Sequence, residues 1–493
     1  MTDEILEGVL DEFKQLAQIP RPSKHEEKVS AYLYKHLLTF GFDVTQDKHK
    51  NIIVEVPASE GKENAPLTIL QAHMDMVCVA EKNVDFDPLT SPIKLLRDEK
   101  FLTAESTSLG ADDGIGIAII LFITKNFFEG KFEEIPHGPL RLIFTTDEES
   151  GMSGAINLHK SHIDDAQFML NCDHQNFNEV VVGSAGHLYT EFTRKIKFFD
   201  AEIFSSAANS VTSLKIKVAG LRGGHSGIEI DDNRANAIKI LAKVLREINL
   251  RGNIRLANIF GGTATNVIPS SSDATILTDL SLDEVKNISE KISAQIKKIF
   301  IGEENLTIDV EEVEMPEKVF SAEDFKSLIN LLTLIHSGVY EMSATLPKTV
   351  ISSANLGMIR TDDKISVNLM PRSNVDELFA EIETLNRTVA ELTNFEVRFR
   401  EPTSAWNFNP DGKLAQIAAE IFERQNNFPA QVRIFHAGLE CSHFIEKNPA
   451  LDIISIGTTN EFIHSPKERL HLDTVTPQVN LIVETLRKIS DLK

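Results

Sequence analysis

The sequence of 493 residues contains few cysteines and no long apolar run. Its three cysteines, Cys78, Cys172 and Cys441, are scattered and form no CxxC pair, which excludes a zinc–thiolate site of the usual spacing and favours a reducing compartment. The longest apolar run, IGIAIILFI after Gly114, is much shorter than the roughly 18 residues that span a bilayer. We therefore expect a protein without membrane spans, whose metal ligands would be histidines and carboxylates.

Basic residues are also in the minority, with 50 Lys and Arg against 73 Asp and Glu, a net charge of -23. A surface of this sign repels phosphate backbones, so we expect no nucleic-acid partner. The first segment, MTDEILEGVLDEFKQLAQIP, mixes acids with spaced apolar residues and is predicted to form an amphipathic helix rather than a signal peptide. Together with the cysteine pattern, this predicts a cytoplasmic protein with no nucleic-acid or membrane partner.

Strand-like and helical segments alternate up to about residue 185. The strand-like segments are NIIVEV, LTILQAHMDMV, LRLIFTT and AQFMLNC, and a helix is expected from Gly114 to Phe128. This alternation predicts an α/β domain with a mostly parallel sheet flanked by helices. The last part of the chain, from about Trp406, repeats the pattern, and we expect it to return to the same sheet. The catalytic domain is thus predicted to comprise residues 1–187 and 402–493.

Residues 188–401 differ in pattern and predict an inserted α+β domain. The segments RLANIF, ATILTDL, a helix from Ser281 and LTIDVEE are followed later by ISSANLGMI, KISVNLM, a helix from Asn374 and FEVRFRE. The order strand, strand, helix, strand therefore occurs twice. We predict a lid and dimerisation domain of two similar halves.

Two motifs in the first part of the chain place acidic residues at the ends of apolar segments. In QAHMDMV, His73 and Asp75 are two apart on a strand and point to the same side, so that one could bind a metal ion and the other orient it; a polar pair at a strand end is the alternative. In SLGADDGIGIA, Asp112 and Asp113 precede an apolar helix. One acid could cap that helix, but a cap does not require two adjacent acids between glycines.

Three further motifs follow predicted strands. Glu148 and Glu149 follow LRLIFTT and could divide metal binding from general-base work; Asp173 ends AQFMLNC, and His464 follows LDIISIG. Each alone is as typical of a solvated loop, a turn or a surface histidine. All five motifs, however, lie at the carboxyl ends of predicted strands, where open α/β sheets bind ligands. Two histidines with three or four carboxylates suit two divalent ions that share a carboxylate, so the sequence predicts a dinuclear hydrolase.

These motifs resemble those of the di-zinc metallopeptidase family of aminoacylases, carboxypeptidases and dipeptidases, in particular its bacterial aminoacyl-histidine (Xaa-His) dipeptidase branch. The resemblance covers nearly the whole chain and rests on the ordered segments IPRPSKHE, HMDMV, GADDGIG, DEESGMSGA, NCDH and HSPKE. It implies a homodimeric enzyme of broad specificity, which hydrolyses Xaa-His and related dipeptides with a water that bridges two zinc ions. Manganese or cobalt could substitute for zinc.

The resemblance also implies a role for each residue of the site. The implied metal ligands are His73, Asp112, Glu149, Asp173 and His464, with Asp112 as the bridge between the ions. Asp75 would orient His73, and Glu148 would be the general base. The peptide bond between Asp112 and Asp113 is expected to be cis.

Further candidates lie in the predicted lid and near the chain's last quarter. In GLRGGHSGIEI, the resemblance implies that His225 stabilises the oxyanion, often across a dimer, although an ordinary loop histidine is the alternative. Asn266 in GGTATNVIP and Arg372 in LMPRS suit an amide and a substrate carboxylate. Gly438 and Glu440 in HAGLECSHF are expected in the substrate pocket.

Other functions compatible with these motifs are those of a related tripeptidase, carboxypeptidase or N-acyl amino acid deacylase. A different class is a catalytically silent relative that only binds peptides. Such a relative would typically lack the base or a ligand, and this sequence has them all.

Overall fold

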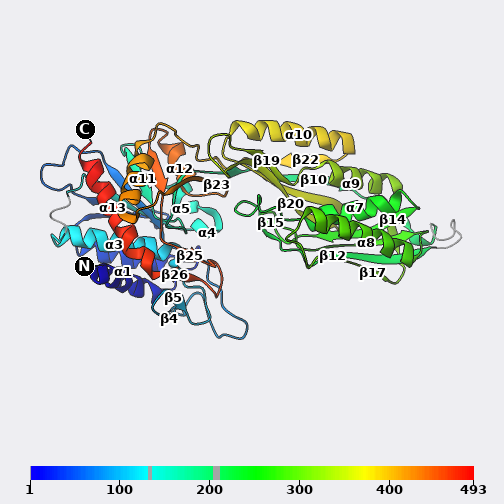
Figure 1. Ribbon diagram of the computed structural model, residues 1–493, viewed down its shortest axis with the longest axis horizontal. Coiled ribbons are helices and arrows are strands. Elements are labelled where there is room, and N and C mark those ends of the chain that lie inside the picture. Colours follow the sequence, from blue (N-terminus) through cyan, green and yellow to red (C-terminus); the bar gives the residue numbers. More distant parts are fainter. Residues whose placement is uncertain (1, 132–135, 204–210, 493) are drawn as a thin grey trace. The chain divides into compact units, whose positions relative to one another are not determined.

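The computed structural model describes residues 2–131, 136–203 and 211–492, which belong to two compact units (Figure 1). Unit 1 comprises Met1–Ser184, Trp406–Ile434 and Leu439–Lys493, and unit 2 comprises Ala185–Ala405 and Phe435–Gly438. The units divide after Ser184 and after Ala405, whereas the domain boundaries predicted from the sequence, after residues 187 and 401, stay predictions. The return of 435–438 to unit 2 was not predicted, so Gly438 lies in unit 2 rather than in the catalytic domain to which the sequence assigned it.

Unit 1 is built on an eight-stranded sheet of order β1-β2-β6-β3-β7-β24-β8-β23. Its strands are β1 Asp43–Gln46, β2 Ile52–Val56, β3 Thr68–His73, β6 Leu140–Thr145, β7 Phe168–Asn171, β8 Glu179–Ser184, β23 Gln431–Phe435 and β24 Asp452–Ser455. The central neighbours β6, β3, β7 and β24 are parallel, whereas β1, β2 and β6 pair antiparallel, as do β24 and β8. The predicted parallel order thus holds at the centre of the sheet, and the late strand β24 joins it.

Helices cover the central strands of unit 1, which are completely buried. They are α1 Thr2–Ala17, α2 Glu27–Leu38, α3 Ala111–Phe128, α4 Glu148–Gly151, α5 Ser153–Asn157, α11 Lys413–Asn426, α12 Cys441–Lys447 and α13 Val475–Ser490, with short 3₁₀ turns at Lys160–His162 and Leu472–Thr474. Every residue of β3, β6 and β7 is buried, as expected of parallel strands covered on both faces. The apolar helix α3 packs against α1, α13 and β3 (Figure 1). Its first turn therefore lies near the sheet strand that ends at His73.

A second, four-stranded sheet in unit 1 joins the two ends of the chain. Its order is β25-β26-β5-β4, and its strands are β4 Leu95–Arg97, β5 Phe101–Ala104, β25 Asn460–Glu461 and β26 Arg469–His471. The loop between β25 and β26 carries His464. Pairing of β26 with β5 therefore holds this loop close to the segment that precedes α3.

Unit 2 contains a ten-stranded sheet with the main order β17-β12-β16-β14-β20-β21-β10-β22. The strands of this path are β10 Thr190–Lys195, β12 Thr212–Ala219, β14 Ile254–Gly261, β16 Ser272–Thr278, β17 Thr307–Glu312, β20 Val350–Thr361, β21 Lys364–Ser373 and β22 Glu396–Phe399. Short strands complete the unit: β9 Gly186–His187, β11 Phe198–Asp200, β13 Gly224–His225, β15 Val267–Ile268, β18 Lys318–Phe320 and β19 Gly338–Met342. Its helices are α7 Ala237–Asn249, α8 Leu282–Ile299, α9 Ala322–Leu334 and α10 Glu377–Thr393.

The main sheet of unit 2 consists of two halves with the same strand order. From the outer edge inwards, one half has β17, β12, β16 and β14, and the other has β22, β10, β21 and β20. The halves meet where β14 pairs antiparallel with β20. The predicted duplication is therefore visible in the topology, with α8 and α10 at equivalent places in the repeat.

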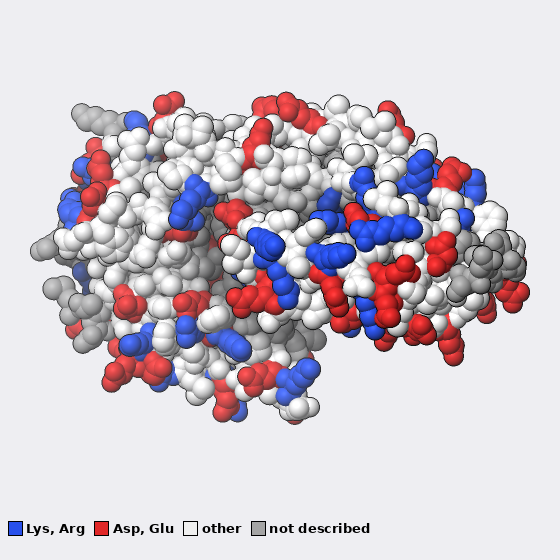
Figure 2. Space-filling view, turned by 45° about the vertical axis from the view of Figure 1, so that its right-hand side comes forward, with Lys and Arg blue, Asp and Glu red and all other residues white. Residues whose placement is uncertain are grey.

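The visible face of the molecule carries charges of both signs (Figure 2). Acidic and basic side chains are interspersed on the face that Figure 2 shows. Within the described ranges, no helix is both long and apolar enough to cross a membrane.

Candidate metal centre

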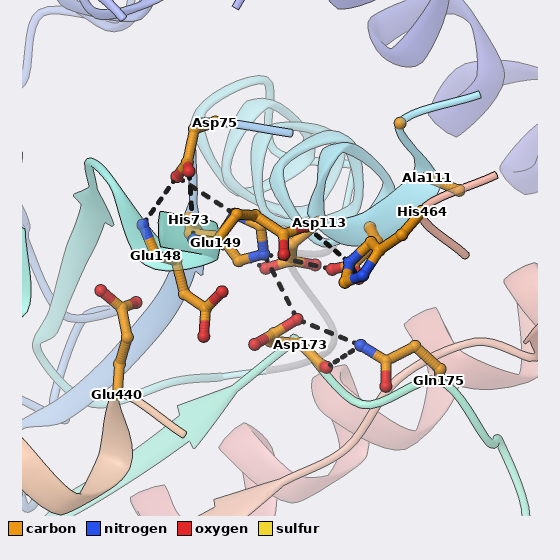
Figure 3. A network of polar contacts seen from close by, with 12 residues as sticks. His73, Asp75, Ala111, Asp113, Glu148, Glu149, Asp173, Gln175, Glu440 and His464 are labelled. Atoms are coloured by element: carbon orange, nitrogen blue, oxygen red, sulfur yellow. Dashed lines mark hydrogen bonds and ion pairs between the residues drawn. The ribbon is translucent and has the colours of Figure 1, made fainter. Parts of the chain in front are cut away.

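Three strand ends, one helix start and one loop bring the predicted metal-binding side chains of unit 1 together. His73 ends β3, Glu148 and Glu149 begin α4 after β6, and Asp173 follows β7. Asp112 lies in the first turn of α3, and His464 lies in the loop before β26. Because β6, β3 and β7 are parallel neighbours, their carboxyl ends meet at one edge of the sheet, and these side chains converge there (Figure 3).

The two carboxylate oxygens of Asp112 face two different groups of ligands. Its Oδ1 lies 3.1 Å from Nε2 of His73, which is itself 3.4 Å from Oδ1 of Asp173. Its Oδ2 lies 3.2 Å from Nε2 of His464, which is 2.9 Å from Oε1 of Glu149. Asp112 therefore has the arrangement of a carboxylate that bridges two metal ions.

Asp75 contacts both His73 and the start of α4. Its Oδ1 lies 3.5 Å from Nδ1 of His73, and Nδ1 has no closer polar partner in the described residues. The same carboxylate accepts hydrogen bonds from the backbone amides of Glu148 at 3.0 Å and Glu149 at 3.2 Å, and from the Ser23 hydroxyl at 2.8 Å. Asp75 thus lies where it could orient the imidazole, and its hydrogen bonds fix the backbone that carries the two glutamates.

The backbone at the start of α3 departs from helical geometry. The bond between Asp112 and Asp113 is cis, which the sequence resemblance had implied. Asp113 is buried, and its carboxylate accepts a hydrogen bond of 3.2 Å from the backbone amide of His73. With His73 and Asp173, Asp113 also forms one of the groups able to hold a metal ion, a position that the sequence did not predict for it.

Crowded negative charge dominates the electrostatics of the centre. Burial raises the pKa of Asp173 to about 8, and burial together with the charge of Asp173 raises that of Glu148 well above its usual range. Burial lowers the pKa of His464, but its contacts with Asp112 and Glu149 outweigh this and raise it to about 11. Because a buried cluster of carboxylates holds protons so strongly, it also favours bound cations.

Comparison with known proteins agrees with this geometry. A model of the family described as Peptidase family M20/M25/M40 matches residues 69–488. The chain belongs to the peptidase family M20/M25/M40. As a member of this family it is a hydrolytic enzyme, which confirms the predicted enzyme class.

Known proteins resemble this M20 peptidase over nearly its whole length, two of them at 30% identity or more. It is 30% identical to the cytosol non-specific dipeptidase of Escherichia coli (strain K12), and the match covers 97% of each chain. The crystal structure of aminoacylhistidine dipeptidase from Vibrio alginolyticus matches with a TM-score of 0.83 at 31% identity, over 98% of this chain and 96% of that one. Aminopeptidase PepT from Bacillus cereus, at 17% identity and a TM-score of 0.52 over 99% of each chain, shares the fold.

Two buried residues that the sequence did not single out hold the backbone of the peptidase's metal centre. The Arg21 guanidinium donates hydrogen bonds of 2.9 Å to the carbonyl oxygens of Met74 and Asp75, and one of 2.5 Å to that of Gly110. It therefore ties the loop after β3 to the segment before α3. Arg21 lies in IPRPSKHE, one of the segments on which the family resemblance rests. Its place in that segment was the sequence signal that could have identified it.

Glu468 fixes the same segment from the carboxyl-terminal side of the chain. Its Oε2 accepts hydrogen bonds from the amides of Leu109 and Gly110 at 2.8 and 3.0 Å, and its Oε1 from those of Ala111 and Asp112 at 2.8 and 3.4 Å. One carboxylate thus satisfies four successive backbone amides that would otherwise lack acceptors at the start of α3.

The candidates of the predicted lid lie in unit 2, where they converge on Ser226. The Ser226 amide donates to the carbonyl oxygen of Asn266 at 2.8 Å, and its hydroxyl accepts a hydrogen bond of 3.4 Å from Nε of Arg372. Burial lowers the pKa of Arg372 to about 10. Burial and the positive charge of Arg372 together lower the pKa of nearby His436 to about 3. Unit 2 thus presents a buried cationic guanidinium, and beside it a neutral imidazole, His436, that the sequence did not predict.

The neighbouring His225 has a defined tautomer. Its Nδ1 accepts hydrogen bonds from the amides of Gly227 and Ile228 at 3.2 and 3.1 Å. An acceptor at Nδ1 leaves the proton of the neutral ring on Nε2, so Nε2 is a hydrogen-bond donor.

Proposed function

We propose that this M20 peptidase is a dipeptidase that uses two zinc ions. The observation that carries the proposal is the position of Asp112, one oxygen of which faces His73 and Asp173 while the other faces His464 and Glu149. Two imidazoles with carboxylates and no thiolate suit zinc, and they would also accept manganese or cobalt. The named activities of the two full-length relatives, a non-specific dipeptidase and an aminoacylhistidine dipeptidase, support dipeptides as substrates.

In this proposal, Glu148 is the general base. Two ions bound here would lower the pKa of water and polarise the scissile carbonyl. Glu148 accepts a proton from the attacking water and then donates it to the leaving amine, so one carboxylate serves both half-reactions. Two features support this role: burial and neighbouring acids raise the pKa of Glu148, and the Asp75 carboxylate holds its backbone amide.

The proposal also assigns roles in catalysis and substrate binding to residues of unit 2. We assign Nε2 of His225 to the oxyanion, either from the same subunit or from a partner subunit, because its tautomer makes it a donor. Arg372 would bind the substrate carboxylate, since it is a buried guanidinium, and Asn266 and Gly438 would contact the peptide near it. Unit 2 would then act as a lid and a dimerisation domain of a cytoplasmic homodimer.

The decisive test is a substrate panel assayed with metal-free protein reconstituted with Zn²⁺, Mn²⁺ or Co²⁺. We expect cleavage of several unblocked dipeptides, Xaa-His among them, with two ions per chain by elemental analysis. Preferential cleavage of tripeptides, of longer peptides from the carboxyl end, or of N-acyl amino acids would instead identify the related tripeptidase, carboxypeptidase or deacylase. Peptide binding without turnover by any metal-loaded form would indicate a non-catalytic relative.

The assembly is tested separately by light scattering. A mass of twice 54.9 kDa is expected for the homodimer, and a monomeric active enzyme would rule out a contribution of His225 across subunits.

A further inference from the structure

Glu440 is a buried carboxylate beside Glu148 that is only half satisfied. It is 1% exposed and directly precedes α12 in unit 1. Its Oε2 accepts hydrogen bonds from the Gln71 amide at 2.7 Å and the Thr145 hydroxyl at 2.6 Å. Its Oε1 is equally buried but has no hydrogen-bond partner in the described residues. In Figure 3 this carboxylate lies next to Glu148, on the side away from His464.

An unpaired carboxylate oxygen in a buried position is unfavourable unless a cation or donor meets it. Burial raises the pKa of Glu440 to about 7, which reflects this deficit of positive charge. A metal ion is not the expected partner, because none of the groups of described residues that could hold one includes Glu440. The position therefore suits a cation that arrives with the substrate.

A dipeptide brings one cation close to the reacting carbonyl. The α-nitrogen is separated from the scissile carbonyl carbon by a single carbon atom, so a group that binds the α-ammonium must lie beside the group that activates the attacking water. Glu440 has this relation to Glu148, because the two side chains lie next to each other at the metal centre in Figure 3.

We propose that Oε1 of Glu440 binds the free α-ammonium group of the substrate and makes the enzyme select peptides with an unblocked amino terminus. The inference rests on the proposed dipeptidase function and deepens it. It assigns Glu440, which the sequence predicts in the substrate pocket, to the amino end of the substrate. It also gives a physical reason why this site would reject N-acyl amino acids, whose acyl group carries no α-ammonium.

The test compares two substrates that differ in the amine alone. These are the alanyl dipeptide that the wild-type enzyme cleaves best and its propanoyl analogue, which has a hydrogen in place of the α-ammonium. For the wild type we expect kcat/KM to be at least about 100-fold higher for the dipeptide, because a site built to pair a polar group discriminates strongly against its absence. In Glu440→Gln the ratio should fall below about 10, mainly through a higher KM for the dipeptide, with two metal ions retained.

Two further variants separate recognition from structure. Glu440→Asp keeps the negative charge but holds it further from the substrate, because its side chain is one methylene shorter. Its ratio of kcat/KM for the dipeptide to kcat/KM for the propanoyl analogue should lie between those of the wild type and Glu440→Gln. Glu12→Gln removes another buried acid of unit 1, which pairs with His36 and Lys125 at a distance from the metal centre, and it should leave the ratio unchanged.

The failures of the two proposals are distinguishable. A wild-type enzyme that cleaves no dipeptide would refute the proposed function itself. A wild type that cleaves dipeptides and the propanoyl analogue equally well would overturn the assignment of Glu440 without any variant. An equal loss on both substrates in Glu440→Gln would also overturn it, because the residue would then only support Gln71 and Thr145.

Discussion

Replacement of Glu468 by glutamine should destabilise unit 1 strongly, although the change is one atom. The nitrogen of the introduced side-chain amide cannot accept a hydrogen bond, so two of the four backbone amides at 109–112 lose their acceptor. Hydrogen bonds to charged groups contribute about 1.5 to 3 kcal/mol each, which gives a loss of about 3 to 6 kcal/mol. Burial raises the pKa of the Glu468 carboxyl, which means that the buried charge is itself unfavourable. The neutral amide of glutamine avoids this cost of burying a charge, so we expect a net loss of about 3 kcal/mol in the free energy of unfolding.

Urea unfolding of the metal-free protein, followed by tryptophan fluorescence, measures this loss. The only tryptophan, Trp406, is buried in unit 1 and therefore reports on this unit. Glu461→Gln is the matched control, because Glu461 pairs with Arg469 on the same hairpin but is 37% exposed, and such pairs contribute about 0 to 1 kcal/mol. A Glu468→Gln protein within about 1 kcal/mol of the wild type would refute the reasoning.

Three other predictions concern the base, the bridge and a buried histidine. Glu148→Gln should bind two metal ions but lose about 10²- to 10⁴-fold in kcat, and normal turnover by a metal-loaded variant would exclude it as the base. Asp112→Ala should lose metal and activity together, whereas two ions per chain by elemental analysis would show that it is not the bridge. His436 has a folded pKa of about 3, below its unfolded value near 6.5, so only the unfolded chain gains a proton as the pH falls between them. The stability conferred by neutral His436 is thus complete above about pH 6.5 and falls by about 2 to 3 kcal/mol at pH 4.5. In His436→Gln this part of the pH dependence should vanish in urea titrations, and an unchanged pH profile would contradict it.

The sequence predicted those parts of the molecule that depend on local pattern. The duplication in unit 2 was visible because each half repeats its own strand and helix periodicity. The positions of His73, Glu148 and Asp173 followed from the ends of buried strands, since parallel strands bring their carboxyl ends to one edge. The antiparallel outer strands were not predicted, because strand direction depends on connections that carry no periodic signal.

The supports of the centre depend on contacts between distant segments, and the sequence did not show them. Arg21 donates to carbonyl oxygens 53 and 89 residues away, and backbone acceptors leave no trace in the side-chain pattern. Glu468 was visible as part of HSPKE but not as the acceptor of four amides. The half-satisfied state of Glu440 likewise depends on Gln71 and Thr145, which lie in strands remote from it in sequence.

The insertion of β24 between β7 and β8 has a consequence for the chain as it is synthesised. Domains generally fold from the amino terminus as the chain leaves the ribosome. Unit 2 has nearly all of its residues once Ala405 has been made, whereas the sheet of unit 1 still lacks the strand between β7 and β8. The acids of the metal centre are synthesised before His464 and Glu468, so on the proposed mechanism the nascent chain can acquire peptidase activity only after residue 468 has been added and β24 has joined the sheet.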